Sequence, residues 1–122
     1  MKVAWSKEVE YTPDWNANKA LPEAEQIKVK MTIFTLGELL AIREELKGVG
    51  FEGGDTARLT GTQIEGIAKI GGKYLPAHIT LIGDANFTVQ DAVTYSQFFG
   101  FVVEILFHLI ASSAPKADDV KN

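Results

Sequence analysis

Glu104 and His108 are the residues whose types and spacing are most suggestive of chemistry, because they lie four positions apart in the most apolar stretch of the chain, residues 98–110. On a helix this spacing places both side chains on one face, where they could bind a metal ion with His78 as a third ligand. The sequence contains only two histidines, whereas a catalytic zinc site usually has three protein ligands and one open position. We therefore favour a contact between Glu104 and His108 that satisfies both groups within a core or an interface.

Two short motifs imitate ligand-binding loops. Residues 48–53 have glycines at the G-x-G-x-x-G spacing, but a predicted helix precedes them where a dinucleotide-binding loop requires a strand. Asp84, Asn86 and Thr88 have the spacing of the first three EF-hand ligands, yet a valine replaces the glycine of that loop and a tyrosine replaces its bidentate glutamate. We interpret the first motif as a loop between helices and the second as a turn that leads to a helix cap at Thr88.

Motifs of the common enzyme classes are missing from the sequence. It contains no nucleophile elbow, no P-loop and no H-E-x-x-H pattern. The absence of cysteine removes thiolate nucleophiles and cysteine-type zinc sites together. We therefore predict that the protein is not an enzyme and that it has no catalytic, cofactor-binding or metal-binding residues.

The composition is typical of one folded domain, since 46% of the 122 residues are apolar and 23% are charged. The net charge of -4 is too acidic for an electrostatic grip on phosphate backbones. Charged residues occupy the N-terminal positions where a secretory signal needs an apolar run, and the apolar stretch is shorter than the roughly 20 residues that span a bilayer. We expect a cytoplasmic protein that binds neither nucleic acid nor a membrane.

The first elements that the sequence predicts are two β-strands. Apolar and polar residues alternate over residues 3–11 and again over residues 27–33, which is the period of a half-buried strand. The intervening residues 12–26 form a long loop without a crossover helix, so the two strands should pair antiparallel. With Glu8 opposite Lys30, two pairs of opposite charge form across the hairpin, which favours the register in which paired residue numbers sum to 38.

About three helices should follow this hairpin. Thr35 begins a capping box for a first helix that ends at Gly48, and Thr62 begins a similar pattern for a second helix that reaches Pro76 at the latest. Apolar spacing predicts that one face of the first helix carries Leu36, Leu39, Leu40, Arg43 and Leu46.

A third capping box begins the last predicted helix, at Thr88. This helix covers residues 89–112 and would be on the order of 35 Å long. Residues 78–83 fit either a strand or an extended linker. The fold class is thus α+β, with an N-terminal antiparallel β-hairpin that has a long loop, then about three helices, the last one long and apolar. Residues 1–115 should form a single globular domain and residues 116–122 a polar tail.

Aromatic residues are distributed around the last predicted helix in more than one stripe, and no Lys or Arg occurs between Tyr74 and Pro115. A domain of this size can cover such a helix only in part, so the helix is either central or docked against a partner. A tryptophan in the long loop, flanked by turn-forming amides, should also be docked rather than displayed in water. We predict a homo-oligomer whose partner-binding residues are Trp15, Phe98, Phe99, Phe101 and Phe107.

The long loop also carries a family resemblance. Residues 11–19 (YTPDWNANK) and 21–29 (LPEAEQIKV), together with the closing Lys121 and Asn122, resemble a group of small tailed-bacteriophage proteins that are encoded among tail genes and described as tail assembly chaperone-like. The resemblance implies a non-enzymatic morphogenesis factor that binds other phage tail proteins in the host cell cytoplasm. The alternative is a structural virion component, a connector or tail subunit held in a ring, and a third possibility is a small ligand-binding domain or enzyme.

Overall fold

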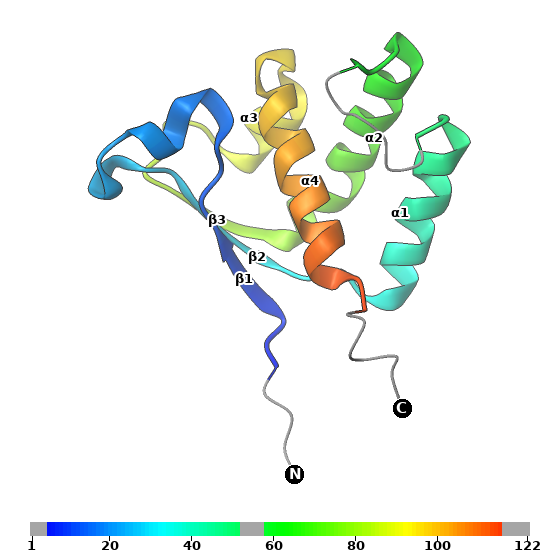
Figure 1. The fold of residues 1–122 in the computed structure, drawn as a ribbon, viewed down its shortest axis with the longest axis horizontal. Helices are drawn as coiled ribbons and strands as arrows, with labels where there is room; N and C mark the ends of the chain where they lie inside the picture. Colours follow the sequence, from blue (N-terminus) through cyan, green and yellow to red (C-terminus); the bar gives the residue numbers. More distant parts are fainter. Residues whose placement is uncertain (1–4, 52–57, 116–122) are drawn as a thin grey trace.

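The computed structural model describes residues 5–51 and 58–115, and within these ranges the fold combines one small sheet with four α-helices. Three antiparallel strands lie in the order β1-β2-β3, with β1 at Glu8–Tyr11, β2 at Lys28–Thr32 and β3 at Ile79–Gly83. The helices are α1 (Leu36–Gly48), α2 (Gly61–His78), α3 (Val89–Thr94) and α4 (Phe99–Ser113). The architecture is α+β, as the sequence predicts (Figure 1).

The N-terminal hairpin is antiparallel, but its register differs from the predicted one by two residues. Glu10 pairs with Lys30 and Tyr11 with Val29, so paired numbers sum to 40. The predicted register needs Ile27 in the ladder, whereas the side chain of Asn18 bonds both the N–H and the carbonyl of Ile27. The alternation of apolar residues fits either register. The hydrogen bonds from Asn18 to Ile27 therefore decide where the ladder ends.

Each of the helices α1, α2 and α3 begins with a capping box. Reciprocal capping boxes begin α1 at Thr35 and α3 at Thr88, as predicted. The cap of α2 is Thr60, not the predicted Thr62, and it bonds with Gln63. The helix α2 also continues past Pro76 to His78, which contradicts the predicted end. Proline is tolerated there because the carbonyl that loses its donor belongs to Gly72, which is only partly buried and so within reach of water.

The last helical region is not the continuous helix that its lack of proline predicts. Tyr95 has an extended backbone, with φ -101° and ψ 132°, and it separates α3 from the 3-10 turn η4 (Ser96–Phe98) that leads into α4. Just before this break, the hydroxyl of Thr94 bonds the carbonyl of Gln90 at 2.6 Å, a back-bond that competes with regular helix geometry. The two helices on either side of the break both pack against α2.

The buried face of α1 also differs from the predicted one. Leu39, Ile42 and Leu46 are buried, whereas Leu36 and Leu40 remain 65% and 56% exposed. Apolar spacing alone cannot distinguish these two faces, because each one carries leucines at helical spacing.

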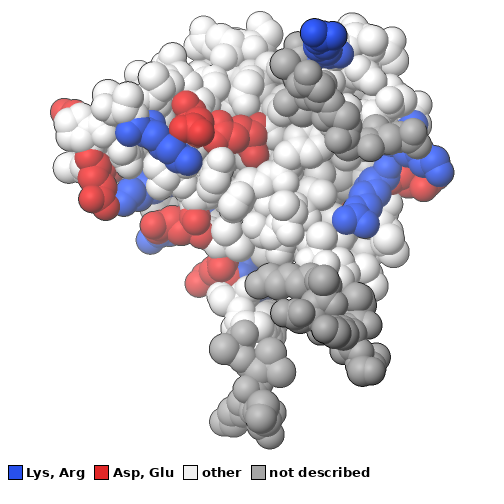
Figure 2. Space-filling view, in the orientation of Figure 1, with Lys and Arg blue, Asp and Glu red and all other residues white. Residues whose placement is uncertain are grey.

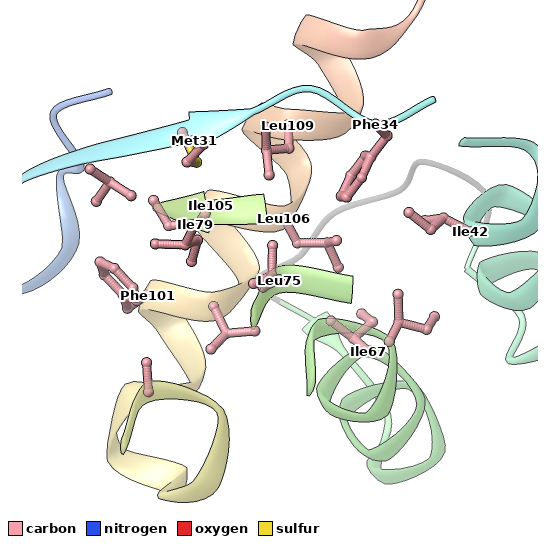
Figure 3. Packing of buried hydrophobic residues seen from close by; sticks show 14 of the residues in the cluster. Met31, Phe34, Ile42, Ile67, Leu75, Ile79, Phe101, Ile105, Leu106 and Leu109 are labelled. Carbon is pink, nitrogen blue, oxygen red and sulfur yellow. The ribbon is translucent and has the colours of Figure 1, made fainter. Parts of the chain in front are cut away.

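A single core lies between the sheet and the helices. Met31 points from β2 toward Leu75 of α2 and toward Ile105 and Leu109 of α4 (Figure 3). Val29 of β2 and Phe101 of α4 belong to the same cluster, and all of these residues are nearly or fully buried. The opposite face of the sheet is exposed at Glu10, Lys30 and Leu81. The sheet is therefore covered by helices on one face, and α4 is its central covering element (Figure 1). The predicted polar tail, residues 116–122, lies outside the described residues.

Candidate functional site

The long loop between β1 and β2 is ordered and docks on α4, as expected. It contains the 3-10 turns η1 (Trp15–Ala20) and η2 (Glu23–Glu25). The indole of Trp15 lies within 5.7 Å, between ring centroids, of Phe87, Phe98 and Phe101. A Cβ at Gly100 would lie 3.2 Å from the Trp15 ring. The absence of a side chain at Gly100 therefore allows the indole to pack closely against α4.

Asn18 organises the interior of this loop. It is 2% exposed, donates hydrogen bonds to the carbonyls of Pro13 and Ile27, and accepts one from the Ile27 N–H at 2.7 Å. The two residues that precede Asn18, which are Asn16 and Ala17, adopt left-handed φ angles of 55° and 58°. Such angles cost free energy for residues other than glycine. The buried amide thus fixes a backbone path that the chain does not favour locally.

Glu104 anchors the loop from α4. Its carboxylate accepts hydrogen bonds from the Tyr11 hydroxyl at 2.6 Å, the Asp14 N–H at 2.6 Å and the Trp15 N–H at 2.9 Å. His108 stacks on the Tyr11 ring, with centroids 3.9 Å apart. The expected direct contact between Glu104 and His108 is therefore replaced by a shared neighbour, Tyr11. Helical spacing brought the two residues to one face, but the partner comes from β1, and local spacing gives no sign of it.

Burial and charge shift the pKa values of two groups around this anchor. Desolvation, then the hydrogen bond to Glu104, raises the pKa of Tyr11 to about 12. Desolvation lowers the pKa of His108, against a smaller opposing effect of the Glu104 charge. The phenol therefore acts as a permanent donor near neutral pH. All three donors to Glu104 are intramolecular, so this cluster holds the loop.

A second polar cluster, which the sequence does not reveal, surrounds His78 at the end of α2. Its Nε2 lies 2.8 Å from a Glu38 oxygen and its Nδ1 lies 2.9 Å from the Thr32 carbonyl. The Thr32 hydroxyl also lies 3.0 Å from Nδ1. The same Glu38 closes the capping box of α1 through Thr35. The hydrogen bond from His78 is the main reason why the pKa of Glu38 is lowered, so this cluster joins β2, α1 and α2.

The ligand-like motifs do not form a binding site within the part of the chain that the structure describes. No three side chains of His, Cys, Asp or Glu among these residues gather closely enough to hold a metal ion. In the glycine motif, α1 includes Gly48 and Gly50 has a φ of 80°, while residues 52–57 fall in the undescribed gap. Thr88 caps α3 and bonds with Asp91, as predicted.

The five predicted partner-binding residues occupy different environments. Phe101 is fully buried and Phe98 is 8% exposed, so both are core residues, which corrects the expectation that they face a partner. Trp15 is half-buried against them. Only Phe99 and Phe107 lie on the outer side of α4, where each is partly exposed.

The outer side of α4 carries two shallow apolar grooves that share Phe99. One groove, of about 450 Å³, is lined by Phe99, Gly100, Val103, Glu104 and Phe107. The other, of about 210 Å³, lies between α2, α3 and the start of α4, and its rim includes Ile64 and Tyr95, which are 42% and 59% exposed. We call these two grooves together the α4 surface.

The α4 surface is largely uncharged. Figure 2 shows a white central region over α4, with charged side chains gathered over the loop on its left and over α1 on its right. Among the residues that the structure describes, Glu104 is the one charged residue that lines either groove. Such a surface suits contact with apolar side chains of another protein.

By length and composition, one helical stretch among the described residues, Ser96–Ser113, could cross a membrane. One third of that stretch is buried in the protein, and its buried residues form the centre of the core. Core helices of soluble proteins have the same composition, so the stretch is weak evidence for membrane insertion.

Comparison of the chain with protein-family models, with curated proteins and with solved structures gives no match.

Proposed function

We propose that this protein is a non-enzymatic assembly factor of a bacteriophage tail, which acts in the host cytoplasm by binding another tail protein through the α4 surface. The tail assignment depends on the resemblance of the loop sequences between residues 11 and 29. The binding role is supported by one structural observation, the pair of apolar grooves that share Phe99.

The electrostatics and packing favour protein binding over catalysis. Both grooves are shallow, and no cluster of titratable groups is found among their described lining residues. Glu104 lines one of them, but its carboxylate already accepts three intramolecular hydrogen bonds. A partner segment with apolar side chains would cover Phe99, Val103 and Phe107, which lie four residues apart along one face of α4. Burial of such residues contributes roughly 25 cal/mol per Å² of apolar surface.

The direct test is binding of the separately purified products of neighbouring tail genes, measured by calorimetry. Val103→Asp and Phe99→Asp should each weaken binding at least tenfold. Leu81→Asp is a matched control, because Leu81 is also apolar and half-exposed but lies on the open face of the sheet. Thermal unfolding must first show that the variants fold. Equal binding by the wild type and the two α4 variants would contradict the proposal.

A structural virion component is the second candidate. Its supporting observation is that exposed leucines lie at opposite ends of the molecule, Leu21 in the long loop and Leu36 and Leu40 on α1 (Figure 1). Mass spectrometry of purified phage particles separates the two candidates, since an assembly factor is absent from finished particles and a subunit is present in many copies.

A further inference from the structure

We propose that copies of this chain bind one another head to tail, with the exposed stripe of α1 on one copy seated against the acidic turn of residues 21–25 on the next. This inference concerns surfaces other than the α4 surface and does not depend on the proposed function.

The α1 stripe consists of Leu36, Leu40, Arg43 and Lys47. Their spacing of four, three and four residues places them in one line along the helix. The two leucines are 65% and 56% exposed, and both cationic residues are exposed. No acidic oxygen among the described residues lies within 4 Å of Arg43 or Lys47. The stripe thus presents two apolar side chains followed by two positive charges.

The acidic turn presents the complementary pattern. Leu21 is 45% exposed, and Glu23 and Glu25 follow it at exposed positions of η2. The side chain of Glu23 is 84% exposed even though it lies 3.4 Å from Lys28. The hydrogen bonds of Gln26 to the carbonyls of Lys19 and Leu21 fix the path of this turn. It therefore offers one apolar side chain and two negative charges from an ordered backbone.

Charge complementarity selects a second copy as the occupant of the stripe. Leu21 can pack between Leu36 and Leu40 while the two glutamates lie opposite the two cations. Unlike charges across an interface fix its orientation and suppress other pairings.

The position of the two surfaces decides the kind of assembly. In Figure 1 the loop with η2 lies at one end of the longest axis and α1 lies at the other end. Two different surfaces on opposite ends form a heterologous contact, which closes into a ring or continues as a filament. A closed two-fold dimer would require one neighbour to meet both surfaces at once, which their location at opposite ends of the molecule opposes.

Two double variants test the contact. Arg43→Glu with Lys47→Glu reverses the stripe, and Glu23→Lys with Glu25→Lys reverses the turn. In analytical ultracentrifugation the wild type should form species larger than two chains, and each variant alone should sediment as one chain. An equimolar mixture of the two variants should regain species larger than two chains. The intact turn of one variant meets the intact stripe of the other, and the two reversed surfaces also carry unlike charges. All four substitutions in one chain should restore larger species.

A matched control exchanges the exposed ion pair of Glu65 and Lys69 on α2, which should leave assembly unchanged. Circular dichroism checks that every variant folds. The proposal is wrong if the folded wild type sediments as one chain, if either reversed variant assembles like the wild type, or if the two variants still sediment as single chains when mixed. These results leave the α4 surface untouched, so they are independent of the test of the proposed function.

Discussion

The Tyr11 hydroxyl donates a 2.6 Å hydrogen bond to the Glu104 carboxylate and so joins the first strand to the last helix. The same carboxylate receives the backbone N–H groups of Asp14 and Trp15. A single side chain of α4 therefore holds both the end of β1 and the start of the long loop.

Because of this hydrogen bond, the free energy of unfolding should fall as the pH rises through the alkaline range. The pKa of Tyr11 is raised from 10.0 to about 12, first by desolvation and then by Glu104. A raised pKa in the folded state means that the contribution is complete below pH 10 and is lost as the pH rises from about 10 to about 12. Urea unfolding across this range should show the loss, and tyrosinate absorbance of a Tyr74→Phe, Tyr95→Phe variant should place the ionisation of Tyr11 near pH 12.

Tyr11→Phe tests the assignment. It should lower the free energy of unfolding at neutral pH by about 1.5–3 kcal/mol, the range for a hydrogen bond to a charged group. It should also abolish the part of the stability loss at alkaline pH that the ionisation of Tyr11 causes. Tyr95→Phe is the matched control, since Tyr95 is 59% exposed. An unchanged alkaline profile in Tyr11→Phe contradicts the prediction.

The second prediction concerns Asn18 and the docking of Trp15. Asn18→Ala leaves the buried carbonyl of Pro13 and the partly buried carbonyl of Ile27 without this donor, which should cost about 1–3 kcal/mol. In a Trp5→Phe background the emission of Trp15 should move to longer wavelength as the loop detaches. Asn86→Ala, at an exposed position, should change neither property. If the Trp15 emission stays the same in Asn18→Ala, the amide does not hold the loop.

Two adjacent glycines of α2 should respond to alanine with opposite sign. A Cβ at Gly71 would lie 2.5 Å from Val102 Cγ1, whereas a Cβ at Gly72 meets nothing within 4 Å. Gly71→Ala should therefore destabilise the protein by roughly 1–3 kcal/mol, and Gly72→Ala should stabilise it by about 0.5–1 kcal/mol. Denaturant unfolding measures both. Adding Val102→Ala to Gly71→Ala should recover part of the loss, and a loss of equal size at both glycines contradicts the packing of α2 on α4.

The acid limit of stability should depend on Glu38. Its pKa is lowered from 4.5, mainly by the hydrogen bond from His78. A lowered pKa in the folded state contributes stability above the ordinary value, and this contribution is lost as the pH falls through the folded value. Glu38→Gln should be less stable near neutral pH and lose less stability below about pH 4.5. Glutamine retains the capping geometry, and Glu44→Gln should keep the acid profile of the wild type.

Features set by neighbouring residues could be predicted from the sequence. The capping boxes at Thr35 and Thr88 and the antiparallel hairpin depend on short-range hydrogen bonds and on alternation. The register could not be predicted, because Asn18 decides it through contacts with Ile27, nine positions away. Alternation favours the correct sheet face but does not distinguish sums of 38 and 40.

The candidate site was predicted only in part, for a related reason. Aromatic residues surround α4, but only the fold shows that Phe101 faces the core while Phe99 faces outward. The buried face of α1 shares Leu39 and Leu46 with the predicted face but includes Ile42 in place of Leu36 and Leu40. The cluster around His78 depends on contacts 40 and 46 positions apart, for which a single sequence contains no local signal.

The anchoring of the N-terminal loop by α4 has a consequence for synthesis of the chain on the ribosome. Tyr11 and Trp15 are made early, whereas Glu104, which they need, is made about 90 residues later. Until α4 has left the exit tunnel, the indole of Trp15 has neither Phe98 nor Phe101 to pack against. The loop therefore docks only after translation has passed the last helix, and nascent chains arrested before it present an undocked tryptophan to cellular chaperones.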